Sequence, residues 1–278
     1  MIVEHLSFAY RPGRPVLRDV SFRVDRGEAV AVLGANGSGK STLLLCLLHL
    51  VRKFSGNVEV LGVKVTKESA PNVRKRVGLL FQDSNDQLFL PLVTDELAFG
   101  PYNLGLKGGA LREAVSAAAN ELELREFLER KTFQLSHGER KRVAFGTIHA
   151  MSPEVYLLDE PTANLDPRNR DTFHAALRAL HERGKTLVMV SHELDHLPEF
   201  FDRALVLDSG VVAFDGPVGE LYRRPETLKA ANLKVPLLAW LFEGLKKRGV
   251  LPGDAPVPTS VEEAADLLAS LRGLTGRP

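Results

Sequence analysis

The chain has 278 residues, of which 44% are hydrophobic, and this suits one large α/β domain or a smaller domain with an appendage. Its 36 basic and 35 acidic residues give a formal net charge of +1, so no overall field favours nucleic acid or an anionic membrane surface. The single cysteine, Cys46, excludes an internal disulfide and fits a buried packing role in a reducing compartment.

The sequence carries no pattern typical of export or membrane insertion. Residues 1–5 lack the basic start and apolar stretch of a signal peptide. No apolar run approaches the roughly 20 residues that a membrane-spanning helix needs. We therefore expect a cytoplasmic chain that reaches the inner face of the cell membrane only through a partner.

The first half of the pattern predicts strands of two kinds. Residues 3–8 and 16–24 alternate between apolar and polar side chains around a turn at 11–15, which predicts an antiparallel sheet. Residues 29–33 form a continuous apolar run before glycines and a leucine-rich helix, which is typical of a buried parallel strand. Similar apolar runs occur at 77–81, 155–158 and 186–190. The expected fold class is α/β, with a parallel core sheet and an N-terminal antiparallel β subdomain.

Helical patterns interrupt and follow this core. Residues 94–130 are rich in Ala, Leu and Glu with a glycine-containing break at 105–109, and they predict a helical subdomain over about 94–150. After a predicted hairpin at 205–214, the core pattern stops near Pro225. The capping box that starts at Ser260 predicts a last helix. We expect a core domain over residues 1–224 and a small C-terminal helical extension over 225–278, which we interpret as a dimerisation element.

The run Gly34-Ala35-Asn36-Gly37-Ser38-Gly39-Lys40-Ser41 matches the phosphate-loop pattern and lies between an apolar strand and a helix. Backbone N–H groups and the helix N-terminus are expected to surround the phosphates of ATP. Lys40 is expected to reach the β and γ phosphates, Ser41 to bind Mg²⁺ and Thr42 to support the α phosphate. The alternative, a glycine-rich turn without a ligand, does not account for this context.

Adjacent carboxylates, Asp159 and Glu160, end the apolar run at 155–158. A parallel strand would place Asp159 at the carboxyl edge of the sheet beside the phosphate loop, where it is expected to hold Mg²⁺ through water. Glu160 is then placed to orient, or take a proton from, the water that attacks the γ phosphate. In isolation such a pair is often a solvated turn.

Taken in order with Ser136-His137-Gly138-Glu139, residues 161–166 and residues 190–192, these segments resemble the ATP-binding-cassette family from residue 1 to about 224. The resemblance implies a phosphate-loop NTPase core. It also implies that Tyr10 stacks on adenine, that Gln82 contacts Mg²⁺ and water, and that His192 contacts the γ phosphate and the attacking water.

The resemblance further implies a dimer with composite sites. Ser136 and the Gly138 backbone would bind the γ phosphate held by a second chain, and Asp166 would communicate across the dimer. The sequence departs from the commonest family signature, which has glycine at His137 and glutamine at Glu139, so the local contacts to ATP are left open.

The signature Ser-His-Gly-Glu and residues 82–89 resemble the ATPases of cobalt and nickel importers in the energy-coupling-factor group. Residues 95–101 also resemble this group, in a region that receives the coupling helices of a membrane partner; a generic helix packed on the core is the alternative. The implied function is ATP hydrolysis that powers import of a small solute, a cobalt or nickel ion. The implied partners are an identical or paralogous ATPase and an integral membrane transport subunit, without nucleic acid.

Other functions remain as alternatives: an energy-coupling-factor ATPase for vitamin uptake, a soluble ATPase of the same family, or a non-hydrolysing regulatory module. The run His192-Glu193-Leu194-Asp195-His196 also satisfies a zinc-protease pattern. Because His192 directly follows a predicted strand rather than lying within a helix, we prefer the nucleotide-site interpretation.

Overall fold

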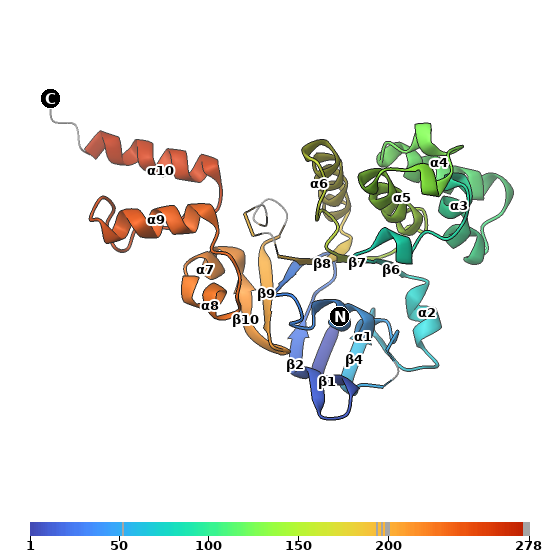
Figure 1. Ribbon diagram of the computed structural model, residues 1–278, viewed down its shortest axis with the longest axis horizontal. Helices are drawn as coiled ribbons and strands as arrows, with labels where there is room; N and C mark the ends of the chain where they lie inside the picture. Colours follow the sequence, from blue (N-terminus) through green and yellow to red (C-terminus); the bar gives the residue numbers. More distant parts are fainter. Residues whose placement is uncertain (52, 193, 196, 198–200, 275–278) are drawn as a thin grey trace.

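In the computed structural model, an antiparallel sheet forms the N-terminal part of the molecule (Figure 1). The structure describes residues 1–51, 53–192, 194–195, 197 and 201–274. The sheet has the strand order β2-β1-β4-β5, with β1 (Ile2–Arg11), β2 (Arg14–Arg23), β4 (Ser55–Val60) and β5 (Val63–Lys64). Arg11 pairs with Arg14 across a tight turn in which Gly13 has a φ of 75°, so both strands run further than the predicted alternation.

The second sheet is mainly parallel, as the continuous apolar runs predict. Its strand order is β10-β9-β3-β8-β7-β6. The strands are β3 (Ala29–Leu33), β6 (Val77–Leu80), β7 (Val155–Asp159), β8 (Thr186–Ser191), β9 (Arg203–Asp208) and the antiparallel edge strand β10 (Val211–Pro217). Leu33 pairs with Ser191 and Asp159 pairs with Val190, so the carboxyl ends of β3, β7 and β8 meet at one edge.

Two apolar cores cover the faces of this parallel sheet. Helix α1 (Lys40–Leu47) buries Leu43, Leu44 and Cys46 between the two sheets. Burial raises the pKa of the Cys46 thiol to about 12, which is consistent with the packing role expected from the sequence. On the other face, α6 (Pro167–Glu182) packs Phe173 and further apolar side chains against the sheet. A short helix, α2 (Ala70–Arg74), precedes β6.

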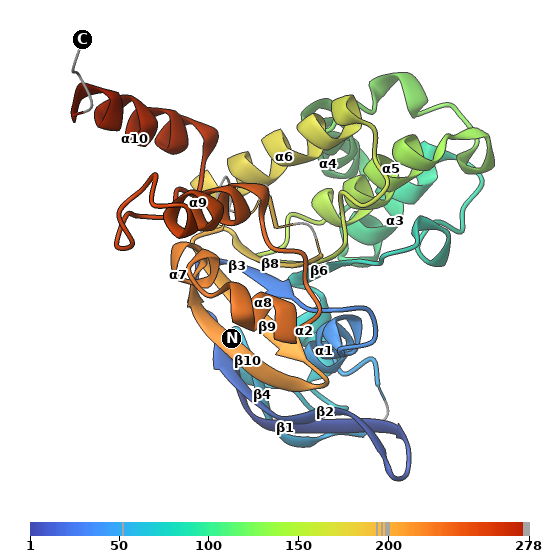
Figure 2. The ribbon, with the colours of Figure 1, turned by 60° about the vertical axis from the view of Figure 1, so that its left-hand side comes forward.

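The inserted helices gather at one side of the sheet (Figure 2). They are α3 (Val93–Asn103), α4 (Gly108–Glu121) and α5 (His137–His149), with single 3₁₀ turns η1 (Ser84–Asp86), η2 (Arg125–Phe127) and η3 (Thr132–Gln134). The predicted break at 105–109 is wrong at its end, because α4 already begins at Gly108. Burial of Val115, Ala118 and Ala119 along α4 outweighs the low helix propensity of glycine.

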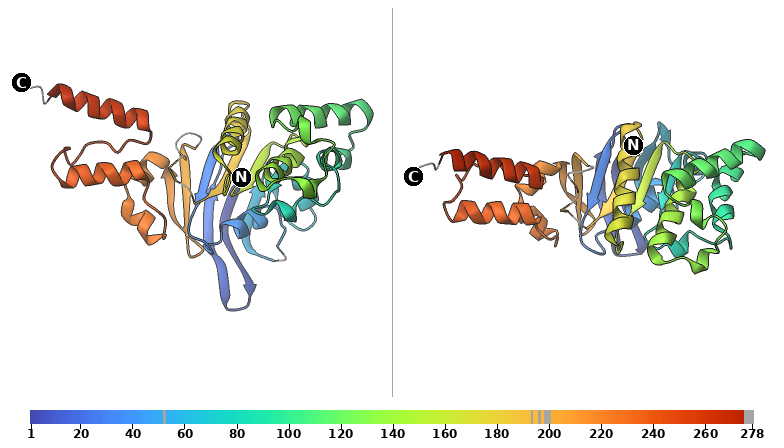
Figure 3. Two further views of the ribbon diagram at one scale, coloured as in Figure 1. Left: turned by 45° about the horizontal axis from the view of Figure 1, so that its top comes forward. Right: turned by 90° about the horizontal axis from the view of Figure 1, so that it is seen from above.

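The C-terminal segment forms α7 (Val218–Tyr222), α8 (Pro225–Ala230), α9 (Leu237–Lys247) and α10 (Val261–Leu274). Helices α9 and α10 project from the core at the opposite end of the molecule from α3, α4 and α5 (Figure 3). Ser260 Oγ accepts a hydrogen bond from the Glu263 N–H at 3.1 Å, so α10 starts where the capping box predicts. None of the helices in the described residues is long and apolar enough to span a membrane.

Candidate functional site

A pocket of about 490 Å³ opens over the phosphate loop at the carboxyl edge of the parallel sheet. It brings together residues from segments that are far apart in the sequence: the N-terminal sheet, the phosphate loop, the segment after β6 and the end of β7. Its lining is Tyr10, Val16, Asn36, Gly37, Gly39, Lys40, Ser41, Thr42, Gln82 and Glu160. Most of the predicted nucleotide-site residues therefore share one cavity.

Glycine is required where the phosphate loop approaches its neighbours. Gly34 has a φ of 155°, and a Cβ added there would lie 2.3 Å from the Leu207 carbonyl oxygen and 2.4 Å from Ser38 Oγ. Gly39, with a φ of 106°, directly precedes α1, and its added Cβ would lie 2.8 Å from Leu17 Cδ2. A side chain at either position would be too close to its neighbours, and glycine adopts these positive φ values without strain. The loop leads into the N-terminus of α1, which favours anions.

The Lys40 side chain folds back over the phosphate loop and binds its backbone. Its Nζ donates hydrogen bonds to the carbonyl oxygens of Gly34 at 2.8 Å and Ala35 at 2.9 Å. The side chain is only 6% exposed. Burial lowers the pKa of Lys40, while the carboxylates of Glu160 and Asp159 act in the opposite direction. The ammonium is thus held at the mouth of the loop, where phosphate oxygens can replace the carbonyl contacts.

Asp159 ends β7 beside the phosphate loop, as the strand pattern predicts. It is buried, and burial raises its pKa, whereas a hydrogen bond from Ser41 and the nearby ammonium of Lys40 oppose that rise. Its Oδ1 atom is buried without a hydrogen-bond partner. Hydroxyl, carboxylate and amide oxygens from Ser41, Asp159 and Gln82 are ligands that suit Mg²⁺, and an unsatisfied buried carboxylate oxygen fits such a site.

Glu160 follows in an unusual backbone conformation. Its φ is 47°, in the left-handed region that non-glycine residues rarely adopt, and its N–H donates to the Val190 carbonyl oxygen at 3.1 Å. The side chain is 8% exposed, and its Oε2 lies 2.9 Å from His192 Nδ1. The two residues that the sequence analysis places near the γ phosphate are therefore in direct contact. No local sequence pattern predicts that contact.

The signature segment lies at the N-terminus of α5. Ser136 Oγ accepts the Glu139 N–H at 3.3 Å, and the Glu139 carboxylate accepts the Ser136 N–H at 2.7 Å, which forms a capping box. Arg130 pairs with Glu139 at 3.1 Å. Glu139 thus stabilises the start of the helix. As the structure describes this chain, the lining of its phosphate-loop pocket includes neither Ser136 nor Gly138.

Asn169 joins the signature to the predicted dimer-communicating residue. A Cβ added at Gly138 would lie 2.7 Å from Asn169 Nδ2, so a larger residue there would displace the Asn169 side chain. Asp166 is the N-cap of α6 and accepts the Asn169 N–H at 3.0 Å. Asn169 was not predictable from the sequence, because its role depends on the close approach of α5 and α6.

Two further residues near the site were also missed. Lys141 is 1% exposed and donates from Nζ to the Glu160 carbonyl oxygen, although it lies in a basic run that suggests a solvated surface. Gln87 accepts the Phe81 N–H at 3.3 Å and donates from Nε2 to the Ala144 carbonyl oxygen at 2.7 Å. The segment that contains Gln82 is thereby fastened to α5.

The zinc-protease pattern at residues 192–196 is only partly described. Its Glu193 and His196 lie outside the described residues, and within the described residues no group of three His, Cys, Asp or Glu side chains could hold a metal ion.

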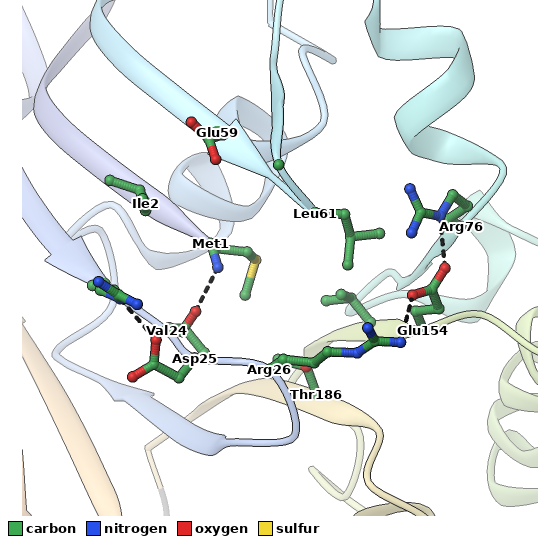
Figure 4. A pocket seen from close by; sticks show the side chains of 13 residues that line it. Met1, Ile2, Val24, Asp25, Arg26, Glu59, Leu61, Arg76, Glu154 and Thr186 are labelled. Carbon is green, nitrogen blue, oxygen red and sulfur yellow. Dashed lines mark hydrogen bonds and ion pairs between the residues drawn. The ribbon is translucent and has the colours of Figure 1, made fainter.

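A second pocket, of about 280 Å³, lies beside the N-terminal residue and contains none of the predicted site residues (Figure 4). Glu154 pairs there with Arg76 at 2.6 Å and with Arg26 at 3.3 Å, and the Met1 ammonium donates to the Val24 carbonyl oxygen. Because these charges bind one another, we do not assign a ligand to this pocket.

Comparison with known proteins gives concordant results. A family model described as ABC transporter matches residues 17–163. The chain is 38% identical over 270 residues to the energy-coupling factor transporter ATP-binding protein EcfA of Methanothermobacter thermautotrophicus, covering 96% of this chain and 86% of the relative. CbiO1 from Clostridium perfringens, part of the ABC transporter complex cbiONQ, is 31% identical with a TM-score of 0.74, covering 87% of this chain and 98% of CbiO1. A dimeric ATP-binding cassette in a post-hydrolysis state with ADP and Pi is 27% identical with a TM-score of 0.72, covering 78% and 98%.

Proposed function

Because the chain belongs to the ATP-binding-cassette transporter family, we propose that it is the ATP-hydrolysing subunit of a membrane importer. The observation that carries this proposal is one pocket in which the phosphate loop meets Gln82 and Glu160, with Glu160 in contact with His192. Such a set of groups would surround a terminal phosphate with a cation, a carboxylate and an imidazole.

The substrate is held mainly by the loop and by Tyr10. The Tyr10 side chain is 60% exposed, its ring meets Phe8 edge to face at 4.7 Å, and its hydroxyl lies 3.3 Å from Thr42 Oγ1. An exposed ring fixed from behind is suited to stack on adenine. Asn36, Gly37, Ser38 and Gly39 curl around the phosphates, whose oxygens replace the carbonyl contacts of Lys40.

Hydrolysis depends on the groups at the ends of β7 and β8. Glu160 orients the attacking water and accepts its proton, and His192 fixes the carboxylate while it donates toward the γ phosphate. Gln82, which lines the same pocket, completes the water site. Ser41, Asp159 and Gln82 would hold Mg²⁺, which neutralises phosphate charge when bound.

We further propose that two ATPase subunits, identical or paralogous, complete each site. Ser136 and Gly138 lie at a capped helix N-terminus, which favours an anion, yet they are absent from the lining of the pocket in the described part of their own chain. They would bind the γ phosphate held by the facing subunit, and Asp166 would report its presence through Asn169. A solved relative with this fold is a dimer with ADP and Pi.

The membrane partner is proposed to dock beside α3. Three exposed aromatic side chains, Phe89, Phe99 and Tyr102, lie on or next to this helix, and Phe89 meets Phe99 edge to face at 4.9 Å. We call these three residues the aromatic face. Such exposed aromatic side chains are typical of a protein interface, and the segment fastened by Gln87 connects this face to Gln82. This contact would place the chain at the inner face of the cell membrane.

The solute is proposed to be a cobalt or nickel ion. The Ser-His-Gly-Glu signature supports this group, and relatives include an energy-coupling factor ATPase and CbiO1 of the cbiONQ complex. Uptake of a vitamin through the same kind of complex is the alternative. Reconstitution with the membrane partner and uptake of labelled cobalt, nickel and vitamins would distinguish them.

The C-terminal extension is proposed to help hold the ATPase dimer together without nucleotide. Leu237, Trp240 and Leu241 on α9 are exposed in this chain. Helix α9 buries Ala239 and Phe242 instead, because its apolar residues are split between two faces. Deleting residues 225–278 should shift the nucleotide-free protein toward monomer in light scattering, and an unchanged mass would remove this part of the proposal.

The first experiment is ATP hydrolysis against protein concentration for the wild type and for Glu160→Gln, with ATP-dependent mass measured for both. Composite sites predict a rate that rises faster than linearly, and a variant that dimerises with ATP without turning it over. A linear rate with no ATP-driven dimer would contradict the dimer. A wild type that binds ATP but never hydrolyses it, even with its membrane partner, would favour the regulatory alternative.

A further inference from the structure

A buried ammonium group lies directly behind the proposed catalytic carboxylate. Lys141 belongs to the second turn of α5 and is 1% exposed. Its Nζ donates to the Glu160 carbonyl oxygen and, at 3.5 Å, to the Ala163 carbonyl oxygen. The side chain therefore contacts the backbone of Glu160 and is not among the described residues that line the pocket.

Burying this group is unfavourable, so its presence needs a reason. Desolvation lowers the pKa of Lys141, while Glu160 and Asp159 oppose that effect. An apolar side chain of similar length would fill the space without this desolvation. The turn itself already has backbone hydrogen bonds, since the Glu160 carbonyl accepts the Ala163 N–H at 3.3 Å and the Glu160 N–H reaches Val190.

These backbone hydrogen bonds alone do not maintain the rare backbone conformation of Glu160. Its φ of 47° is disfavoured for any residue with a Cβ, and relaxation to an ordinary conformation would swing the carboxylate away from His192. An ammonium that attracts the carbonyls of Glu160 and Ala163 together fixes the peptide planes on both sides of the turn.

We propose that Lys141 is a positioning residue for hydrolysis: it holds Glu160 in the left-handed turn, so that its carboxylate faces His192 and the pocket. The inference rests on the proposed ATPase function. It also connects Glu160 to α5, whose N-terminus carries Ser136 and Gly138. Ordering of that N-terminus by a partner's nucleotide would thus reach the carboxylate through one side chain.

The test compares Lys141→Met, which keeps length but removes the donors, with Lys141→Gln, which retains a donor. Lys185→Met is the matched control, because Lys185 Nζ also donates to a backbone carbonyl, that of Pro153 at 2.8 Å, away from the pocket. Steady-state ATPase and MgATP affinity are measured with the full chain, at temperatures where circular dichroism shows each variant folded.

Lys141→Met should lower kcat by about 10- to 100-fold, the scale of a misplaced catalytic group, with KM for ATP changed less than about threefold. Lys141→Gln should recover part of that loss, and Lys185→Met should stay within about twofold of the wild type. In a Glu160→Gln background, Lys141→Met should leave the residual single-turnover rate nearly unchanged, because both substitutions act through one group.

A folded Lys141→Met variant with wild-type kcat would overturn the inference and leave the ATPase proposal intact. The same slowing in the Glu160→Gln background would also overturn it, since Lys141 would then act independently of Glu160. If Lys141→Met does not fold, Lys141→Leu, which also lacks a donor, decides by the same two measures. A wild type that hydrolyses no ATP, alone or with its membrane partner, would remove the ATPase proposal and this inference together.

Discussion

Glu96 fixes the loop that carries part of the aromatic face, and it does so with a buried carboxylate. The residue is 2% exposed, and its Oε1 accepts the backbone N–H groups of both Phe89 and Leu90. Burial nevertheless raises the pKa of Glu96, because desolvation outweighs those two bonds. At neutral pH the ionised carboxylate therefore costs the folded chain stability relative to a neutral group of the same shape.

Two substitutions separate shape from charge. Glu96→Ala removes the acceptor of two hydrogen bonds, each contributing about 1–1.5 kcal/mol net to stability. It also removes about 1 kcal/mol of stabilisation from burial of the side-chain methylene groups. Relief of the carboxylate's desolvation offsets part of this loss. The expected loss is about 2–4 kcal/mol in the free energy of unfolding at pH 7. Glu96→Gln keeps an acceptor oxygen without the charge, so its stability at pH 7 should equal or exceed that of the wild type.

The pH dependence has a defined sign. A carboxylate with a raised folded pKa binds more protons in the folded than in the unfolded state between the two pKa values, so its contribution to stability improves as pH falls. The free energy of unfolding of the wild type minus that of Glu96→Gln should therefore increase as pH falls from 7 toward 4.5, the ordinary pKa of the carboxyl in the unfolded chain. Urea denaturation followed by circular dichroism measures it. Three results would refute the reasoning. They are a free energy of unfolding of Glu96→Ala within about 0.5 kcal/mol of the wild type, a wild-type minus Glu96→Gln difference that does not change with pH, and a large loss of stability in Glu96→Gln.

Two further predictions concern the proposed nucleotide-binding site and a buried histidine. Tyr10→Ala should weaken MgATP binding by about 5- to 150-fold in calorimetric titration, which corresponds to about 1–3 kcal/mol of base stacking. The affinity of Tyr10→Phe should stay within about threefold of the wild type, because the hydroxyl contact with Thr42 is long, at 3.3 Å. An unchanged affinity in Tyr10→Ala would contradict the stacking role. His149 contacts the Tyr156 hydroxyl at 3.1 Å and the Glu121 carboxylate at 3.0 Å, and burial lowers its pKa from 6.5. The folded state therefore binds fewer protons than the unfolded state, and the free energy of unfolding falls as pH drops below about 6.5. His149→Gln should flatten that fall between pH 7 and 5.5 in thermal unfolding, and an unaltered slope would count against it.

The parts of the site that follow from periodicity and topology were predictable from the sequence. An apolar strand, a glycine-rich turn and a helix fix the phosphate loop, and parallel pairing then brings Asp159 to the same edge of the sheet. The contact between Glu160 and His192 joins two strand ends through a left-handed turn, and no local pattern specifies that turn. Lys141 was missed for a related reason, since burial of a lysine depends on tertiary packing that composition does not reveal.

Helix α5 connects the separate elements of the proposed cycle. Its N-terminus carries Ser136 and Gly138, which we propose bind the facing subunit's nucleotide. Lys141, one turn further, contacts the backbone of Glu160. The segment after Gln82 is fastened to the same helix by Gln87, and it continues into the aromatic face. Because a packed helix moves as one body, a displacement of α5 changes all three contacts together. Closure of two subunits would then assemble the hydrolytic carboxylate and shift the membrane partner's docking surface in one step, which is the coupling that an ATP-driven importer requires.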